Sequence, residues 1–255
     1  DFSLAAGRTL APSWKERARD NVEAIRLLNL LDREQRSASP AEQEAISRFI
    51  GFGASELANN MFARREHEFR EGWEELGQSL VAETTDVELQ SLKRATQYAH
   101  YTPEYIIRAM WDATRTLGFA GGQVLEPGCG SGLFMGLRPD ALSEDTVFVG
   151  IENDPVTARV ASALYPNQVI RCVDFDKASL PDDFDLAIGN PPFSNLTIQN
   201  RTELGKLGLS LHDYFIARSL EHLRPGGIAL FVTSRYSLDK SDPRARHHID
   251  GIADF

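Results

Sequence analysis

Cysteine is scarce in this sequence: Cys129 and Cys172 are the two cysteines among its 255 residues. They provide neither a disulfide framework nor the ligand spacing of a zinc site, which indicates free thiols in a reducing compartment. Long hydrophobic runs are also missing, and none approaches the length needed to span a bilayer. No signal peptide opens the sequence. We therefore expect a cytoplasmic protein with no membrane partner.

Positive charge is in short supply as well. The sequence has 27 Lys and Arg against 37 Asp and Glu, which gives a formal net charge of -10 and a pI near 5.1. This balance is not the profile of a typical nucleic-acid-binding protein. Some basic residues do gather locally, where the pattern fits either a basic groove or, more commonly, a solvated helix face. They are Arg201, Lys206, Arg235, Lys240, Arg244, Arg246, His247 and His248.

Residues 13 to about 95 show helical periodicity and no strand pattern. The first apolar stripe at helical spacing consists of Val22, Ile25, Leu28 and Leu31. Ser39 and Pro40 predict the start of a second helix, with Ser39 as the N-cap. The glycines of "FIGFG" are suited to cap the end of that helix. Further helices are predicted over about 59–77 and 86–99.

The pattern changes after residue 120, where strands begin to alternate with helices. The expected strands lie in "GGQVLEP", "TVFVGIEND", "QVIRCVDF", "DFDLAIG" and "GGIALFVTSR". This alternation predicts an α/β fold with a doubly wound, mostly parallel sheet. We expect a helical N-terminal region over residues 1–95 and an α/β domain over residues 96–255. The last strands of that domain are expected to be missing, because the sequence stops soon after the fifth.

A glycine loop, "LEPGCGSG", follows the first expected strand. Gly128, Gly130 and Gly132 allow a tight turn and a close approach of the backbone to a ligand. A glycine loop alone is also compatible with a dinucleotide enzyme. Glu126, just before the glycines, changes this interpretation, because a carboxylate repels a pyrophosphate but attracts an ammonium group or ribose hydroxyls. S-adenosylmethionine carries both of these groups and no phosphate, so the loop favours this cofactor.

Acidic residues also follow the next two expected strands. Glu152, at the end of the second strand, is suited to bind ribose hydroxyls. Asp174, at the end of the third, is placed to accept a hydrogen bond from an adenine amino group, with Phe175 alongside the ring. Each acid taken alone is explained equally well as the start of a helix or loop. Together with Glu126 they converge on one edge of the sheet, which favours a nucleoside site.

The fourth expected strand ends in "NPPF", because two successive prolines cannot donate ladder hydrogen bonds. The Asn190 side-chain oxygen and a carbonyl of Pro191 or Pro192 offer two acceptors to one amino group. Such acceptors hold the nitrogen lone pair toward an electrophilic methyl, and the prolines make them rigid beforehand. Phe193 is suited to stack on the planar ring that carries the amine, as an extruded base requires. An ordinary turn is also compatible with these four residues, but their position downstream of the glycine loop favours catalysis on an amine.

These motifs, in this order and spacing, resemble those of S-adenosylmethionine-dependent amino methyltransferases. In addition, "AHYTPEYIIRAMW" is similar to the element that precedes the glycine loop in adenine-specific DNA methyltransferases of the gamma type. The resemblance implies a Rossmann-like methyltransferase fold that uses S-adenosylmethionine and no metal. By this resemblance, the methionine end of the cofactor would be held by Tyr101, Thr102 and Pro103, and its middle by Glu126, Pro127, Gly128 and Gly130. Its ribose would be bound by Glu152 beside Asn153, and its adenine by Asp174 and Phe175. The target amine would be bound by Asn190, Pro191, Pro192 and Phe193, with Asn190 also beside the cofactor. A helix start capped by Thr102 is compatible with the same residues.

The resemblance extends to "NVEAIRLLNLLDREQRSASPAEQEAISRFIGFG" and "LGLSLHDYFIARSLEHLRPGGIALFVTSRYSLDK", which look like parts of the large methylase–helicase polypeptides of phages and conjugative elements. It implies a bacterial host cell and a role in restriction, anti-restriction or defence. The implied partners are double-stranded DNA, with the target adenine flipped out, and a linked or separate helicase or recognition module. No target-recognition domain follows the sheet, so DNA reading is expected from other residues, another chain, or not at all.

The leading hypothesis is therefore an adenine-specific DNA methyltransferase domain that transfers a methyl group directly to the exocyclic amine. Methylation of RNA or of a protein glutamine poses the same chemical problem, and "HYTP" is what favours DNA adenine. A non-catalytic binding or assembly module with this fold fits the acidic charge, whereas Asn190, Glu126 and the glycines argue against it. His100 and His212 are interpreted as structural, with His212 at the start of a helix. The helical region is expected to be a lid, a partner contact or a joint to a helicase.

Overall fold

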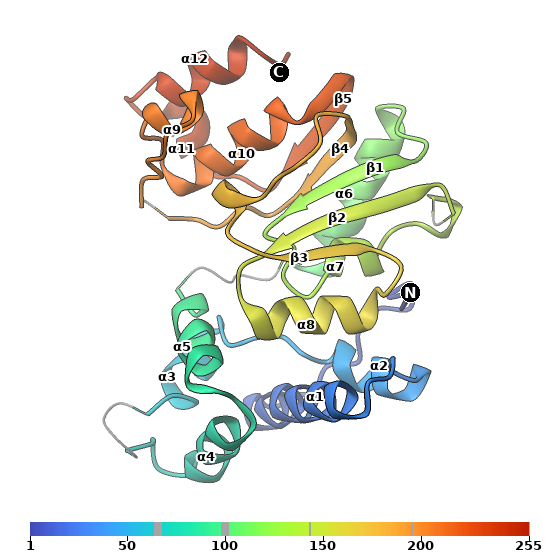
Figure 1. Cartoon of the computed structure of the whole chain (residues 1–255), viewed down its shortest axis with the longest axis vertical. Coiled ribbons are helices and arrows are strands. Elements are labelled where there is room, and N and C mark those ends of the chain that lie inside the picture. The colour runs from blue at the N-terminus through green and yellow to red at the C-terminus, as the bar shows by residue number, and fades with distance from the viewer. Residues whose placement is uncertain (64–67, 98–101, 143, 195, 255) are drawn as a thin grey trace.

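Five parallel strands form the central sheet of the protein (Figure 1), which a computed structural model describes over residues 1–255 except 64–67, 98–101, 143, 195 and 255. The strands are β1 (Gly122–Pro127), β2 (Thr146–Glu152), β3 (Val169–Cys172), β4 (Phe184–Gly189) and β5 (Leu223–Phe231). They lie in the order β3-β2-β1-β4-β5, and every neighbouring pair is parallel. From β1 the chain adds β2 and β3 on one side, and it then adds β4 and β5 on the other side of β1. This reversal of the strand order confirms the predicted doubly wound topology.

Helices cover both faces of this sheet. On one face, α6 (Glu104–Thr116), α7 (Leu133–Gly136) and α8 (Pro155–Leu164) pack against the strands, and on the other lie α10 (Leu211–Glu221) and the short η2 (Phe175–Lys177). Neighbouring residues of β4 illustrate the two layers, because Leu186 belongs to one buried cluster and Ala187 to the other. Both are fully buried. The unbroken apolar runs of these strands follow from this burial on two sides.

Shorter helices complete the α/β part. They are η1 (Asp140–Leu142), α9 (Glu203–Lys206), α11 (Tyr236–Asp239) and α12 (Arg244–Asp250). Three of them, α9, α11 and α12, gather beside α10 at the β5 side of the sheet (Figure 1). A separate buried cluster joins α9, α10 and α12 through residues that include Leu204, Tyr214 and Ile249. No helix in the described ranges combines the length and the apolar character needed to cross a membrane.

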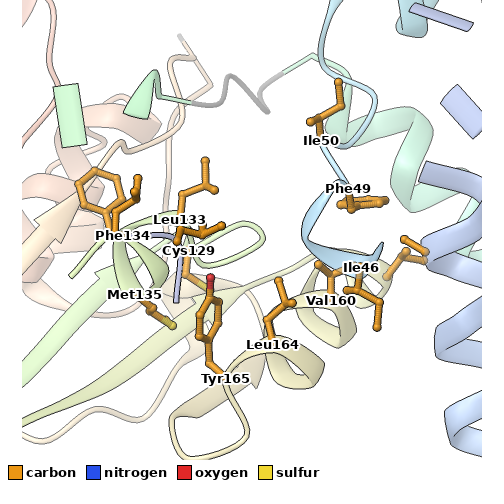
Figure 2. Close-up of a cluster of buried hydrophobic side chains, with 14 of the residues drawn as sticks. Ile46, Phe49, Ile50, Cys129, Leu133, Phe134, Met135, Val160, Leu164 and Tyr165 are labelled. Carbon is orange, nitrogen blue, oxygen red and sulfur yellow. The ribbon is translucent and has the colours of Figure 1, made fainter. Parts of the chain in front are cut away.

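The N-terminal helices are α1 (Trp14–Glu34), α2 (Pro40–Ser47), α3 (Ser55–Asn60), α4 (Glu74–Glu83) and α5 (Asp86–Ala95). They lie beyond α8, on the β3 side of the sheet (Figure 1). Figure 2 shows Ile46 and Phe49 near α8 residues Val160 and Leu164, all of which are buried. One continuous apolar cluster thus includes both the helical region and the sheet.

Arg159 of α8 adds polar links to the same contact. Its guanidinium group pairs with Glu88 of α5 at 3.0 Å and with Asp32 of α1 at 2.6 Å. It also donates to the side-chain oxygen of Asn29 at 2.9 Å. Because one side chain joins three helices, it fixes α5 relative to the α/β part.

The predictions of where helices begin and end are only partly confirmed. Ser39 caps α2 as predicted, with Pro40 at the first position and Glu42 completing a capping box. The predicted helix over about 59–77 is wrong, because α3 ends at Asn60 and α4 begins only at Glu74. Gly72 has a φ of 75°, a left-handed conformation that helices do not continue through. The glycine cap predicted for α2 is also wrong, since that helix ends at Ser47 with Arg48 as its C-cap.

Candidate functional site

A cavity of about 550 Å³ opens at the carboxyl edge of the sheet, where ligands of open α/β sheets bind. Its walls come from the ends of β1, β2, β3 and β4, from the loop after β1, and from α10. Part of α5 also lines it. The volume is suited to a nucleoside-sized ligand and part of a second molecule.

The glycine loop after β1 forms the floor of this cavity. Gly128, Gly130 and Gly132 have φ values of 67°, 56° and 78°, conformations that favour glycine. The backbone N–H of Gly130 donates to Oε2 of Glu152 at 2.9 Å, so the loop is held against the end of β2. The predicted tight turn is therefore confirmed in its backbone geometry, and Gly128 and Gly130 line the cavity, whereas the role of the loop in ligand binding stays a prediction.

Glu126 and Glu152 place two carboxylates in the cavity wall. Glu126 is only 2% exposed, and burial, followed by the charge of Glu152, raises its pKa well above the usual range. Its Oε2 atom is buried and makes no hydrogen bond within the described part of the chain. Burial raises the pKa of Glu152 to about 7, against the opposing hydrogen bond from the backbone N–H of Asp154. Both carboxylates thus lie where a cationic or hydroxyl-bearing ligand stabilises their charged forms.

Asp154, two residues after Glu152, has a structural role. Asp154 is the N-cap of α8, and its Oδ1 accepts from the backbone N–H and the hydroxyl of Thr157, at 2.8 and 2.7 Å. Glu152 makes no such cap to α8; its Oε1 accepts from the N–H of Asp154 at 2.8 Å. The alternative explanation of strand-end acids as helix starts therefore applies to Asp154 rather than to Glu152. Asn153, between them, is exposed and lines the cavity.

An aromatic wall stands at the end of β3. Phe175 is buried and contacts Phe215 of α10, with 4.7 Å between the ring centroids, and both residues line the cavity. Asp174 also lines the cavity and forms an ion pair with Lys177. A planar group that enters here meets apolar ring surface on one side and the Asp174 carboxylate at its edge.

The "NPPF" motif lies on the other side of the glycine loop. Asn190 and Pro192 line the cavity, whereas Pro191 and Phe193 are not among its described lining residues. A Cβ atom placed on Gly128 would lie 3.9 Å from Cδ of Pro192, so the glycine loop and the motif are close together. The ring of Phe193 instead stacks on His212 of α10. The structure therefore brings Asn190 and Pro192 to the cavity with Glu126 and Glu152, whereas Phe193 is not among the described lining residues and lies against His212.

The "HYTP" element is described only in part, because His100 and Tyr101 fall outside the described residues. Thr102 is 7% exposed and lines the cavity. The predicted capping role of Thr102 is wrong, since Pro103 is the N-cap of α6 and no side chain caps this helix. Pro103 has an extended backbone with ψ of 139°, so the helix begins one residue later, at Glu104. Pro127, at the end of β1, is buried beneath the glycine loop.

The structure adds cavity residues from the helical region that the sequence did not indicate. Ser91, Leu92, Arg94 and Ala95 of α5 line the cavity, together with Gly51 and Phe52. Arg94 is the one cationic side chain among the described lining residues, which also include the acids Glu126, Glu152, Asp154, Asp174 and Asp176. The helical periodicity of α5 predicts an amphipathic helix, but no motif in it indicates a ligand. The lid interpretation of the helical region is the one that this contact favours.

Several basic residues in the described part of the C-terminal stretch are paired with acids. Lys240 pairs with Asp213, and Arg244 pairs with Asp242 at 2.7 Å. Nε2 of His248 lies 3.0 Å from a carboxylate oxygen of Glu221. These acid partners offset much of the local positive charge, so the alternative of solvated, ion-paired helix faces describes this stretch better.

No protein-family model matches this chain, but curated proteins that are similar to it in sequence include the following two. Defense against restriction protein B of Escherichia phage P1 is 28% identical over 197 residues, which cover 72% of this chain and 9% of that protein. Type II methyltransferase M.TthHB8I of Thermus thermophilus is 33% identical over 128 residues, which cover 44% of this chain and 29% of that protein. The chain thus spans less than a third of the length of either relative.

Solved structures show the same fold. The type I restriction-modification system methyltransferase subunit from Streptococcus thermophilus aligns with a TM-score of 0.52 and 14% sequence identity. The alignment covers 69% of this chain and 46% of that one. With the sheet order and the flanking helices, this likeness confirms the predicted Rossmann-like fold of S-adenosylmethionine-dependent methyltransferases.

Proposed function

We propose that the protein transfers a methyl group from S-adenosylmethionine to the exocyclic amine of adenine in double-stranded DNA. The observation that carries this proposal is the meeting of Glu126, Glu152, the glycine loop and Asn190 in one cavity at the topological switch point. Methyltransferase activity in general is supported by the fold and by the name of one sequence relative. DNA as the substrate is supported by the names of the phage relative and of the Streptococcus structure, which both mention restriction.

The residues of the cavity fit this cofactor. The buried Oε2 of Glu126 needs a donor, and an ammonium group supplies one. Glu152, beside the exposed Asn153, accepts from ribose hydroxyls, and the adenine lies along Phe175 with Asp174 at its amino edge. Gly128, Gly130 and the buried Pro127 leave room for the central part, while Thr102, Pro103 and Tyr101 hold the methionine end. When bound, the cofactor supplies an electrophilic methyl group next to the "NPPF" motif.

The chain's part in the reaction is to orient the amine. The side-chain oxygen of Asn190 and a carbonyl of Pro191 or Pro192 accept its two hydrogens, which directs the nitrogen lone pair into the cavity. Because a neutral amine attacks a cation, positioning and dispersal of charge matter more than proton removal. Phe193 stacks on the extruded base. No residue has to act as a base before the attack. The N–C bond would form as the S–C bond breaks, S-adenosylhomocysteine would leave, and the methylated nitrogen would then release its extra proton to water.

The substrate class is tested by incubating the protein with labelled S-adenosylmethionine and duplex DNA, RNA or protein. We expect label in duplex DNA alone, with N6-methyladenine found after nuclease digestion and mass spectrometry. Label in RNA or in a glutamine side chain would instead support the alternative amino methyltransferases. Absence of any cofactor binding in calorimetry would leave the binding or assembly module as the better explanation.

The length of the phage relative supports a second part of the proposal. This chain matches 9% of that protein, so most of the relative consists of other sequence. We propose that residues 96–255 form the methyltransferase domain and residues 1–95 its helical lid within a longer phage or mobile-element polypeptide. A helicase or recognition module, linked or separate, then reads the DNA, because the described basic residues near the C-terminal end are largely paired.

Arg94 is expected to bind the carboxylate of the cofactor, since it is the cation that the described cavity wall offers to an anion. Arg94→Gln should weaken binding of S-adenosylmethionine about fivefold, the worth of a solvent-exposed ion pair near 1 kcal/mol. Binding of 5′-methylthioadenosine, which has no carboxylate, should not change. Lys93→Gln is the matched control, because Lys93 is exposed on the same helix and is not among the lining residues. Calorimetry with both ligands measures the effect, and equal losses for both would contradict it.

Cofactor affinity is expected to depend on pH through Glu152. Its pKa is raised to about 7 in the folded protein, so the carboxylate takes up a proton as the pH falls from 8 to 6. Ribose hydroxyls and an ammonium group bind the charged forms of Glu152 and Glu126 better, so affinity should fall by up to about tenfold per pH unit below 7. Glu152→Gln should flatten this profile. Tighter binding at pH 6 than at pH 8 would contradict the expectation.

Without cofactor, Glu152 is expected to act on stability in the opposite sense. Its pKa is raised from the ordinary value of 4.5 to about 7, so the folded protein binds more protons than the unfolded chain between these two values. Its contribution to the free energy of unfolding is fully present below about pH 4.5 and is lost as the pH rises through 7, and the raised pKa of Glu126 acts in the same direction.

A further inference from the structure

The imidazole of His212 lies directly behind the "NPPF" motif. His212 is in the first turn of α10 and is 6% exposed. Its ring stacks on the ring of Phe193, with 4.4 Å between the centroids and 21° between the planes. Such a distance and angle are those of a stacked aromatic pair. One face of the Phe193 ring is therefore covered by protein before any substrate arrives.

His212 is itself held in place by a neighbouring strand end. Its Nε2 lies 2.9 Å from Oγ1 of Thr233, which follows β5. The main chain of Pro192 and Pro191 is close enough to raise the pKa of the imidazole, although Nδ1 makes no well-aligned hydrogen bond within the described ranges. The ring thus joins α10, the end of β5 and the motif that follows β4.

His212 is poorly suited to proton transfer. Burial lowers its pKa, and this effect outweighs the opposing charge of Asp213. Asp213 is itself paired with Lys240. His212 is also not among the described residues that line the cavity, where a reacting amine would lie. Because the imidazole is engaged with Thr233 and does not line the described cavity wall, it is placed to support its neighbours rather than to exchange a proton with a bound amine.

Phe193 is only half-buried despite this stack, so part of the residue stays accessible. We propose that His212 is a positioning residue that fixes the Phe193 ring from behind, so that the ring's remaining face stacks on the target base. This inference rests on the proposed amino methyltransferase function. The position of His212 at the start of a helix did not by itself indicate this role.

Two variants separate stacking from other roles of His212. His212→Phe keeps an aromatic ring against Phe193, whereas His212→Gln keeps a polar side chain and loses the ring. With DNA as substrate, we expect His212→Gln to lower kcat at least about tenfold, since a displacement near 1 Å in a reacting group can cost up to about 100-fold. His212→Phe should retain kcat within about threefold. The Kd for S-adenosylmethionine should stay within about twofold in both.

A wild-type kcat in His212→Gln would overturn the inference, as would an equal loss in the two variants. A second measurement does not require turnover: the ¹⁹F resonance of 4-fluorophenylalanine incorporated at position 193. His212→Gln should shift and broaden this resonance, because the ring current and the rigid support are removed, and His212→Phe should keep it narrow. An unchanged resonance in His212→Gln would likewise overturn the inference. A wild-type protein that binds no cofactor and methylates nothing would refute the proposed function alone.

Discussion

Asn190→Ala is expected to abolish methyl transfer while the cofactor still binds. Asn190 lies in the cavity wall with Pro192, next to the glycine loop. Its side-chain oxygen is the acceptor that distinguishes this strand end from an ordinary turn. Without it the amine has one fixed acceptor in place of two, and its lone pair is no longer directed. Loss of a preorganised group of this kind costs about 100- to 1,000-fold in kcat.

Single-turnover methylation of duplex DNA measures this effect, and calorimetry measures the Kd for S-adenosylmethionine. The Kd should change less than about fivefold, because most of the residues proposed to bind the cofactor belong to other strands. Asn167→Ala is the matched control, since Asn167 is exposed after α8 and is not among the lining residues. Near-normal transfer by Asn190→Ala would refute the proposed orientation of the amine.

Glu152→Ala is expected to have the largest effect on cofactor binding. The Glu152 carboxylate accepts from the N–H of Gly130 at 2.9 Å and from the N–H of Asp154 at 2.8 Å. It therefore holds the glycine loop and also offers charge to the cavity. Removing it loses the hydrogen bonds to the ribose and loosens the loop. Hydrogen bonds to a charged group contribute about 1.5–3 kcal/mol each, so we expect affinity to fall at least about 30-fold.

Glu152→Gln should lie between wild type and Glu152→Ala, because the amide keeps one acceptor oxygen but loses the charge. Glu144→Ala is the control for removal of an acid, since Glu144 is exposed and does not line the cavity. The melting temperature of each variant shows whether it is folded. If folded Glu152→Ala bound S-adenosylmethionine with wild-type affinity, the ribose assignment would be wrong.

Much of the α/β part follows from local patterns. Apolar runs that end in glycine or proline predict strands, and strands that alternate with helices predict a parallel sheet. Parallel strands place their carboxyl ends along one edge, so the nearness of Glu126, Glu152 and Asn190 follows from the order of their motifs. The Rossmann-like fold could be predicted for this reason, and the three residues do meet in one cavity.

Other features depend on contacts between distant segments. Helical periodicity in α5 indicates which residues form its apolar face, but not which surface covers that face. Contacts such as those from Arg159 to Glu88 and Asp32 place α5 at the cavity, so that Arg94 becomes a lining residue. The sequence pattern did not indicate the break between α3 and α4, and Gly72 at the end of this break has a left-handed backbone that no helix continues through.

The sequence by itself determined the parallel sheet, the glycine loop and the meeting of Glu126, Glu152 and Asn190, because each depends on residues close together in the chain and on a topology with few alternatives. The tertiary structure decided what surrounds them: Arg94 at the cavity wall, and His212 behind Phe193 at 4.4 Å. His212 and Phe193 come from different elements, and they meet only because α10 packs across the strand ends. The physical reason is that side-chain pairs between elements are selected by packing of the whole core, which no local pattern encodes.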